Sequence, residues 1–314
     1  MLRLIAAALA LVTTAAVAQD RIVMATGAKG GTFYDYGPGL ASVIGAGGGP
    51  AIAILETGGS TDNVRLVDSG GAQLGLANMG PVYEAWNASE PWVGGRRMTH
   101  LRALFPMFET PFHVAALARS GVDSILALDG KRVGLGPPKG PAEAVYRALF
   151  AALPIAPQVT LGGPDDLAKM VIDGRLDAFA YGAGLPLPAF QAIAAAAPMR
   201  VFGLTGHEAD LLRRRFPYMA PYTIAPGSYR DQTAPVATVA VWNFVIASAE
   251  LPDDVAYRIV KAVLDQPARV AAIHEAARAT IARNAVADTF LPFHPGARRY
   301  YAEHNIKLVA PSEP

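Results

Sequence analysis

The stretch that decides the fold is residues 22–34, which read IVMATGAKGGTFY. Its four apolar residues, 22–25, predict a short strand, and the glycines that follow predict a tight turn. A helix is then expected from Phe33 to Ile44, with Thr32 as its cap. The first amides of a helix have no intrahelical partner and favour negative charge. This loop is therefore either an anion-binding site or an ordinary strand-to-helix turn.

Residues 1–18 are predicted to be a signal peptide. Arg3 supplies a positive charge, residues 4–12 are apolar, and residues 16–18 read AVA, as at a cleavage site. The mature chain is therefore expected to begin at Gln19 and to be exported. Because the sequence contains no cysteine, disulfides, a cysteine nucleophile and an N-terminal lipid anchor are excluded. The periplasm is the expected location.

Short apolar runs alternate with helical segments along the chain, which predicts α/β lobes with largely parallel sheets. After the first strand, strands are expected at residues 51–56 and 74–77, with a helix at 61–68 that Ser60 caps. The 314 residues are enough for two lobes, each with its own core. The formal net charge of +1 argues against a nucleic-acid partner.

The second half repeats this order of elements. Residues 131–136, KRVGLG, again lead into a turn, and Pro141 suits the first position of a helix expected at 142–151. Two such lobes would enclose a ligand cleft, with the apolar runs 112–118 and 236–247 as the strands that cross between them. The expected divisions are lobe 1 at 19–118, lobe 2 at 119–238, and a second part of lobe 1 at 239–314, whose helices pack on that lobe.

Polar residues gather at the ends of the expected strands, where a ligand of an open α/β sheet usually lies. Simple helix capping is the alternative explanation for those in the first lobe, and an exposed loop position is the alternative for the lysine in the second. The candidates are, in chain order, Thr57, Ser60, Asn63, Asn78 and Met79 from the first lobe, and Lys139 and Tyr181 from the second.

No catalytic constellation stands out. Residues 27–32, GAKGGT, depart from the phosphate-binding order G-x-x-x-x-G-K-[ST], and the sequence contains neither G-x-S-x-G nor H-E-x-x-H. The six histidines have no metal-ligand spacing, and His294, in a turn with prolines, is expected to make structural hydrogen bonds. We therefore expect a binding protein rather than an enzyme, with no cofactor and no metal.

Several motifs follow one another in a specific order: T-G-x-x-x-G-T-[FY]-Y at 26–34, T-G-G-S-x-x-N at 57–63, and the runs at 69–77, 173–179, 184–186, 221–226 and 294–301. With these motifs the chain resembles, along nearly all of its mature length, the TAXI-type solute receptors of tripartite ATP-independent periplasmic (TRAP) transporters. The resemblance implies a two-lobed type II periplasmic binding protein fold with a cleft between the lobes. It also implies a monomeric receptor that hands a small organic acid or amino acid, glutamate- or 2-oxoglutarate-like, to two membrane subunits.

One loop departs from the family pattern. Residues 134–141, GLGPPKGP, lack the hydroxyls of the usual G-x-P-G-S-G-T-like loop and carry Lys139, which we expect to contact an anionic ligand group. A protein that presents its ligand to a sensor kinase and a periplasmic enzyme on the same fold remain as alternatives. The loops and the resemblance together predict a ligand site formed by Thr26, Gly27, Gly31, Thr32, Phe33, Tyr34, Thr57, Gly59, Ser60, Asn63, Asn78, Met79, Lys139, Gly140, Tyr181 and Gly184.

Overall fold

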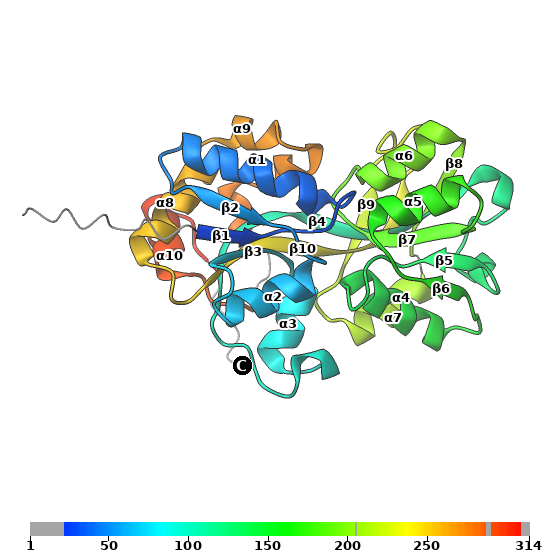
Figure 1. Cartoon of the computed structure of the whole chain (residues 1–314), viewed down its shortest axis with the longest axis horizontal. Coiled ribbons are helices and arrows are strands. Elements are labelled where there is room, and N and C mark those ends of the chain that lie inside the picture. Colours follow the sequence, from blue (N-terminus) through cyan, green and yellow to red (C-terminus); the bar gives the residue numbers. More distant parts are fainter. Residues whose placement is uncertain (1–21, 205, 287–289, 309–314) are drawn as a thin grey trace, which may run out of the picture.

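Two lobes lie side by side and share two long strands that run through both (Figure 1). The computed structural model describes residues 22–204, 206–286 and 290–308, and the predicted signal peptide lies outside these ranges. The shared strands are β4 (Leu101–Leu117) and β10 (Val236–Ser248), which pair antiparallel along most of their length. Both crossing strands expected from the sequence are therefore strands, although β4 begins earlier than its apolar run indicated.

Each lobe has its own part of the sheet. The first contains the strand order β2-β1-β3-β10-β4, and the second continues from β4 to β7, β5 and β6, while β8 pairs with β4 and β9 with β10. The other strands are β1 (Ile22–Ala25), β2 (Ile52–Leu55), β3 (Leu74–Asn78), β5 (Arg132–Gly134), β6 (Gln158–Thr160), β7 (Ala178–Gly182), β8 (Met199–Phe202) and β9 (Ala220–Ile224).

Helices cover both faces of the sheet in each lobe (Figure 1). In the first lobe α1 and α9 lie on one face and α2 and α3 on the other; in the second, α5 and α6 lie opposite α4 and α7. No helix within the described ranges is long and apolar enough to cross a membrane. The bounds are α1 (Thr32–Ala46), α2 (Ser60–Asp68), α3 (Met79–Asn87), α4 (Pro141–Ala152), α5 (Pro164–Ile172), α6 (Pro188–Ala196), α7 (His207–Arg215), α8 (Asp253–Leu264), α9 (Pro267–Ala271) and α10 (Pro295–Glu303), with 3-10 turns at Pro91–Val93, Ala118–Ser120, Leu126–Leu128, Glu275–Ala279 and Ala282–Val286.

The repeated order of elements is confirmed by the strand pairing. In the first lobe β1 pairs parallel with β2 and β3, and in the second β5 pairs parallel with β6 and β7. Each set of three strands therefore has its first strand in the middle, with helices in the connections. Because parallel strands point the same way, the loops after β1 and β3 open at one edge of the first lobe, as those after β5 and β7 do in the second.

The C-terminal helices complete the core of the first lobe. Ile259, Val260 and Val263 of α8 are buried, and Val255 packs against the same cluster of apolar side chains, which includes Leu40 of α1. These side chains recur at helical spacing and form the face by which α8 packs on the first lobe, as expected for the C-terminal helices.

The predicted helix caps at Thr32 and Ser60 are wrong. The residues that precede α1 and α2 are glycines, and neither helix has a side-chain cap. The Thr32 hydroxyl instead donates to the carbonyl of Gly184 in the other lobe at 3.0 Å. The Ser60 hydroxyl oxygen accepts a hydrogen bond from the backbone amide of Asn78 at 2.9 Å. Both side chains are thus used for contacts between distant segments, which a local capping rule does not consider.

Gly296 allows α10 to pack closely on α8, and we expect Gly296→Ala to destabilise the protein. A Cβ there would lie 2.1 Å from the Asp253 carbonyl oxygen and 2.8 Å from the Tyr257 nitrogen, so the helices would have to separate. The expected loss is about 1–3 kcal/mol in the free energy of unfolding, measured by urea denaturation. Gly45→Ala is the matched control, because Gly45 in α1 has no neighbouring atom within 4 Å. It should stabilise the helix by about 0.5–1 kcal/mol; equal effects of the two substitutions would contradict this account of the packing.

Candidate functional site

A cavity of about 60 Å³ lies between the lobes, where the loops after β1, β2, β5 and β7 meet the end of β3 and the two shared strands. This volume is well below the roughly 300–1,000 Å³ of pockets that hold drug-sized ligands, so the cavity suits a small solute. Its lining consists of Gly27, Ala28, Gly31, Thr32, Phe33, Gly58, Gly59, Ser60, Asn78, Thr110, Leu135, Pro137, Gly140, Pro141, Ala142, Tyr181, Gly182, Ala183, Gly184 and Asn243.

Three helices begin at the cavity, two from the first lobe and one from the second. The lining includes the first residue of α1, of α2 and of α4. The first backbone bond at these helix starts is donated by the amide of Tyr34 in α1, of Asn63 in α2 and of Ala144 in α4. The amides before these positions have no intrahelical partner, and the helix dipoles favour negative charge beside them. The cavity is therefore favourable for an anion.

Two buried hydroxyls add hydrogen-bond donors to the cavity. The Ser60 oxygen already accepts from the Asn78 amide, and the Thr110 oxygen accepts from the Asn243 side chain at 2.6 Å. Neither hydroxyl proton has an acceptor among the residues that the structure describes. Each can therefore donate to a bound molecule.

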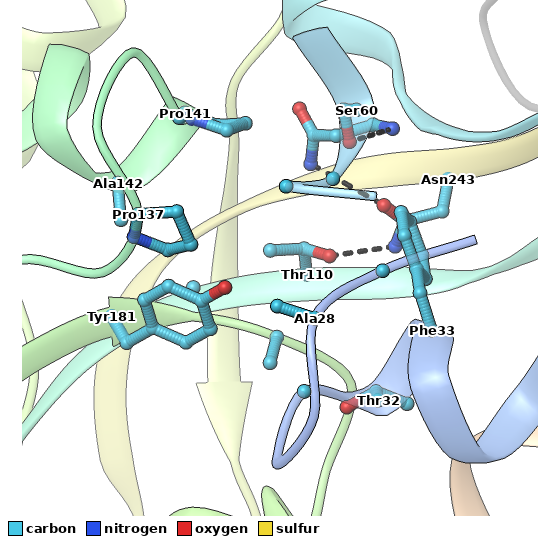
Figure 2. A pocket seen from close by; sticks show the side chains of 18 of the residues that line it. Ala28, Thr32, Phe33, Ser60, Thr110, Pro137, Pro141, Ala142, Tyr181 and Asn243 are labelled. Atoms are coloured by element: carbon cyan, nitrogen blue, oxygen red, sulfur yellow. Dashed lines mark hydrogen bonds between the residues drawn. The ribbon is translucent and has the colours of Figure 1, made fainter. Parts of the chain in front are cut away.

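Tyr181 forms one wall of the cavity, with its hydroxyl toward the centre (Figure 2). Burial raises the pKa of Tyr181 to about 12, so the hydroxyl keeps its proton at neutral pH and acts as a donor. Phe33 lies on the opposite side, and Pro137 and Pro141 add apolar surface (Figure 2). Gly136 makes room for the tyrosine, because a Cβ there would lie 2.4 Å from its ring.

The lining contains no charged side chain among the described residues. Its polar groups are amides, hydroxyls and two asparagines whose side-chain oxygens already accept hydrogen bonds. Free donors therefore lie at the cavity, and no carboxylate among the described lining residues is present to pair with an ammonium group. The arrangement is complementary to carboxylate or carbonyl oxygens attached to a small apolar body. No group of three or more His, Asp or Glu residues that could hold a metal occurs in the described ranges.

Most of the residues predicted for the ligand site lie together at this cavity. The loop after β1 contributes the backbone turn and Phe33, as the sequence indicated, and the loop after β2 contributes its glycine and serine. The predicted residues that line the cavity are Gly27, Gly31, Thr32, Phe33, Gly59, Ser60, Asn78, Gly140, Tyr181 and Gly184.

Other predicted residues hold the loops rather than line the cavity. The Asn63 side chain donates to the carbonyls of Thr26 and Leu76 at 2.6 and 2.7 Å, which ties the ends of β1 and β3 together. The Thr57 hydroxyl bonds to the Asn63 side-chain oxygen at 2.6 Å. Thr26 donates its hydroxyl to the Leu55 carbonyl at 3.2 Å. Those outside the cavity lining are Thr26, Tyr34, Thr57, Asn63, Met79 and Lys139.

Lys139 lies in a second, neighbouring cleft between the lobes. It has a positive φ of 62°, and its backbone amide donates to the Glu143 carboxylate at 2.7 Å. This cleft is also lined by Glu84, Glu90 and Arg215. Glu90 of the first lobe pairs with Arg215 of the second, so these side chains connect the lobes away from the cavity. The predicted contact between Lys139 and a ligand carboxylate therefore has no geometric support.

Two polar residues of the cavity come from the shared strands, and the sequence reasoning missed them. Thr110 lies in β4 and Asn243 in β10, each within a strand of mostly apolar residues. A polar side chain in an otherwise buried strand was the available signal, because such a group must have a buried partner. The further lining residues not predicted are Ala28, Gly58, Leu135, Pro137, Pro141, Ala142, Gly182 and Ala183.

Solved structures of binding proteins share this architecture at low sequence identity. The periplasmic binding protein BugD has a TM-score of 0.55 and 14% identity, over 82% of this chain and 85% of its own. An R. palustris protein solved with adipate has a TM-score of 0.55 and 15% identity, over 91% and 93%. MatC from Rhodopseudomonas palustris, solved with bound malate, has a TM-score of 0.54 and 13% identity, over 81% and 88%.

These similarities and the two-lobed topology give the chain the type II periplasmic binding protein fold with its cleft between the lobes, as the resemblance implied. A family model covers almost all of the described residues, from 24 to 304. The chain belongs to the NMT1-like family.

Proposed function

We propose that the protein is a periplasmic receptor that captures a small organic acid between its lobes and delivers it to the membrane subunits of a TAXI-type TRAP transporter. The observation that carries the proposal is the set of donors at the cavity, with three helix N-termini and no charged side chain among the described lining residues. Such a site neutralises carboxylate oxygens with fixed dipoles. Two proteins of the same fold were solved with dicarboxylates, namely malate and adipate.

Within this proposal, an organic acid without an amino group is the preferred solute over an amino acid. An ammonium group taken from water needs a carboxylate or several acceptors, because leaving a buried charge unpaired is costly. The described cavity lining contains no carboxylate, and each of its two asparagine oxygens already accepts one hydrogen bond. A 2-oxo acid or a dicarboxylic acid therefore fits the donor pattern better than glutamate.

The proposed mechanism is capture followed by closure of the lobes. Closure brings the Thr32 hydroxyl of the first lobe to the Gly184 carbonyl of the second at 3.0 Å. A ligand that touches α1, α2 and α4 together would favour this closed arrangement, since only there do all three helix starts face one cavity. The lobe divisions at 119 and 239, the export of the chain, its monomeric state and its lack of enzymatic activity belong to the same proposal.

Thermal-shift measurements with malate, succinate, adipate and 2-oxoglutarate test the proposal. A ligand at 100 times its Kd adds about 2.7 kcal/mol to the stability of the folded protein, which raises the Tm by about 5–10 °C. Glutamate and aspartate are the matched controls, because they carry an ammonium group on the carbon skeletons of 2-oxoglutarate and of succinate and malate, and they should shift the Tm much less. A protein that responds only to sugars or polyamines would disprove the organic-acid assignment.

The genes that lie next to the gene of this protein test the transport role. A neighbouring gene for a TRAP membrane subunit would support delivery to a permease. A neighbouring histidine kinase gene would favour presentation of the ligand to a sensor instead.

A further inference from the structure

A chain of hydrogen bonds fixes the orientation of the side chains of two asparagines that line the cavity, Asn78 and Asn243. The Gly80 amide donates to the side-chain oxygen of Asn78 at 3.0 Å, so the Asn78 NH₂ group must point the other way. It faces the side-chain oxygen of Asn243 at 3.4 Å. A backbone N–H can only donate, so this first bond determines the direction of those that follow.

Asn243 is fully buried, and both hydrogens of its NH₂ group are used. One goes to the Phe108 carbonyl oxygen at 2.7 Å. The other goes to the Thr110 hydroxyl oxygen at 2.6 Å (Figure 2). Because a carbonyl can only accept, the amide cannot be turned round. The Thr110 oxygen is therefore an acceptor toward Asn243, and its own proton remains to be donated elsewhere.

The hydroxyl proton of Thr110 is available to a molecule in the cavity. Thr110 is almost fully buried and lines the cavity from β4, next to Asn243 of β10. Within the described residues no protein acceptor takes its proton. A buried hydroxyl proton without a partner is unfavourable, so a bound molecule with an acceptor at this point would satisfy it.

We propose that Thr110 donates a hydrogen bond to the ligand and that Asn243 is the positioning residue that makes Thr110 a donor. The inference rests on the proposed function, since it assigns a recognition role within the same cavity. It adds a preference to the proposed site: an oxygen acceptor of the ligand is favoured beside Thr110, because only an acceptor satisfies the free hydroxyl proton. The contact also comes from the strands that cross between the lobes, so recognition takes place at the junction of the lobes.

Isothermal titration with malate tests the role of Thr110. Thr110→Val keeps the shape of the side chain and removes the hydroxyl, and it should weaken malate binding about 10-fold or more, as expected for a hydrogen bond to a charged group. Thr110→Ser keeps the hydroxyl and should bind within about threefold of the wild type. Thr280→Val is the matched control, because the buried Thr280 hydroxyl bonds to the Met107 carbonyl away from the cavity lining. It should leave malate affinity unchanged while it lowers the Tm.

A double-mutant cycle tests the role of Asn243. If Asn243 acts on the ligand through Thr110, the variant with both Thr110→Val and Asn243→Ala should bind malate no more weakly than Thr110→Val alone. A purely structural role would instead add its loss in both backgrounds. Asn243→Ser replaces Asn243→Ala if the alanine variant does not fold, as judged by its thermal melting curve.

The possible failures can be told apart. A wild-type protein that binds none of malate, succinate, adipate and 2-oxoglutarate would overturn the proposed function, and this assignment with it. Wild-type binding of malate that Thr110→Val leaves unchanged would overturn the assignment of Thr110 alone. Additive losses in the double-mutant cycle would overturn the positioning role of Asn243 and leave the Thr110 contact standing.

Discussion

Ser60→Asp should abolish the binding of organic acids while the protein stays folded. Ser60 is the first residue of α2 and lines the cavity, so an aspartate there places a carboxylate among the amides that we assign to the ligand. Two negative charges about 4 Å apart repel each other by about 4 kcal/mol at an effective dielectric constant of 20. We therefore expect a loss of at least 100-fold in affinity, measured by isothermal titration with malate or adipate.

Ser60→Asn is the control for size and shape, because asparagine matches aspartate without the charge. It should cost no more than about tenfold in affinity, so the two variants separate charge repulsion from crowding of the cavity. The aspartate can also bond to the free amides at the start of α2, so the Tm of Ser60→Asp should not fall below that of Ser60→Asn. Equal affinity of both variants for malate would mean that the ligand has no negative charge near α2.

The order of elements and the main loops of the site could be predicted from the sequence because their signals are local. Alternating apolar runs and helical segments gave the two repeats, and the glycines of residues 26–31 and 57–60 marked loops at strand ends. A loop after a strand in a parallel sheet must open at one edge, so its position follows from the topology alone. Gly27, Gly59 and Ser60 reach the cavity for this reason.

The partners of individual side chains could not be predicted, because they are distant in sequence. Thr32 was expected to cap its own helix, yet its hydroxyl bonds to Gly184 in the other lobe. Asn63 was expected at the ligand, yet its amide group is used to hold the loops after β1 and β3. Local rules describe a helix start correctly only when no tertiary partner competes for the same oxygen or amide.

Thr110 and Asn243, the two cavity residues of the shared strands, could not be predicted for a different reason. Thr110 and Asn243 are far apart in the chain, and their pairing depends on the register of β4 and β10, which shifts between Trp242 and Phe244. An irregular register of this kind changes which residues face the cavity, and no local pattern determines it. Lys139 has a positive φ of 62° and lines the neighbouring cleft, so its contact with a ligand stays a prediction.

The stability of the protein should fall by about 3 kcal/mol between pH 6.5 and pH 4 because of one buried histidine, His113. Its Nδ1 faces the Pro111 carbonyl at 3.0 Å and its Nε2 faces the Tyr229 hydroxyl at 2.7 Å, so the neutral ring satisfies both partners. Burial lowers the pKa of His113 from 6.5 to about 4. Between these values the unfolded chain binds more protons than the folded one, so acid favours unfolding, by about 1.4 kcal/mol for each pKa unit of difference.

Urea denaturation at several pH values from 6.5 to 5 measures this effect before most carboxylates are protonated. His113→Gln is the control: it removes the titrating ring, so its stability should be lower at pH 7 but should change less with pH than that of the wild type. Burial also lowers the pKa values of His274 and His294, so both residues reduce stability as the pH falls. They do so equally in the wild type and in His113→Gln, and their effect cancels when the two proteins are compared. Parallel pH profiles for the two proteins would show that His113 is not held neutral.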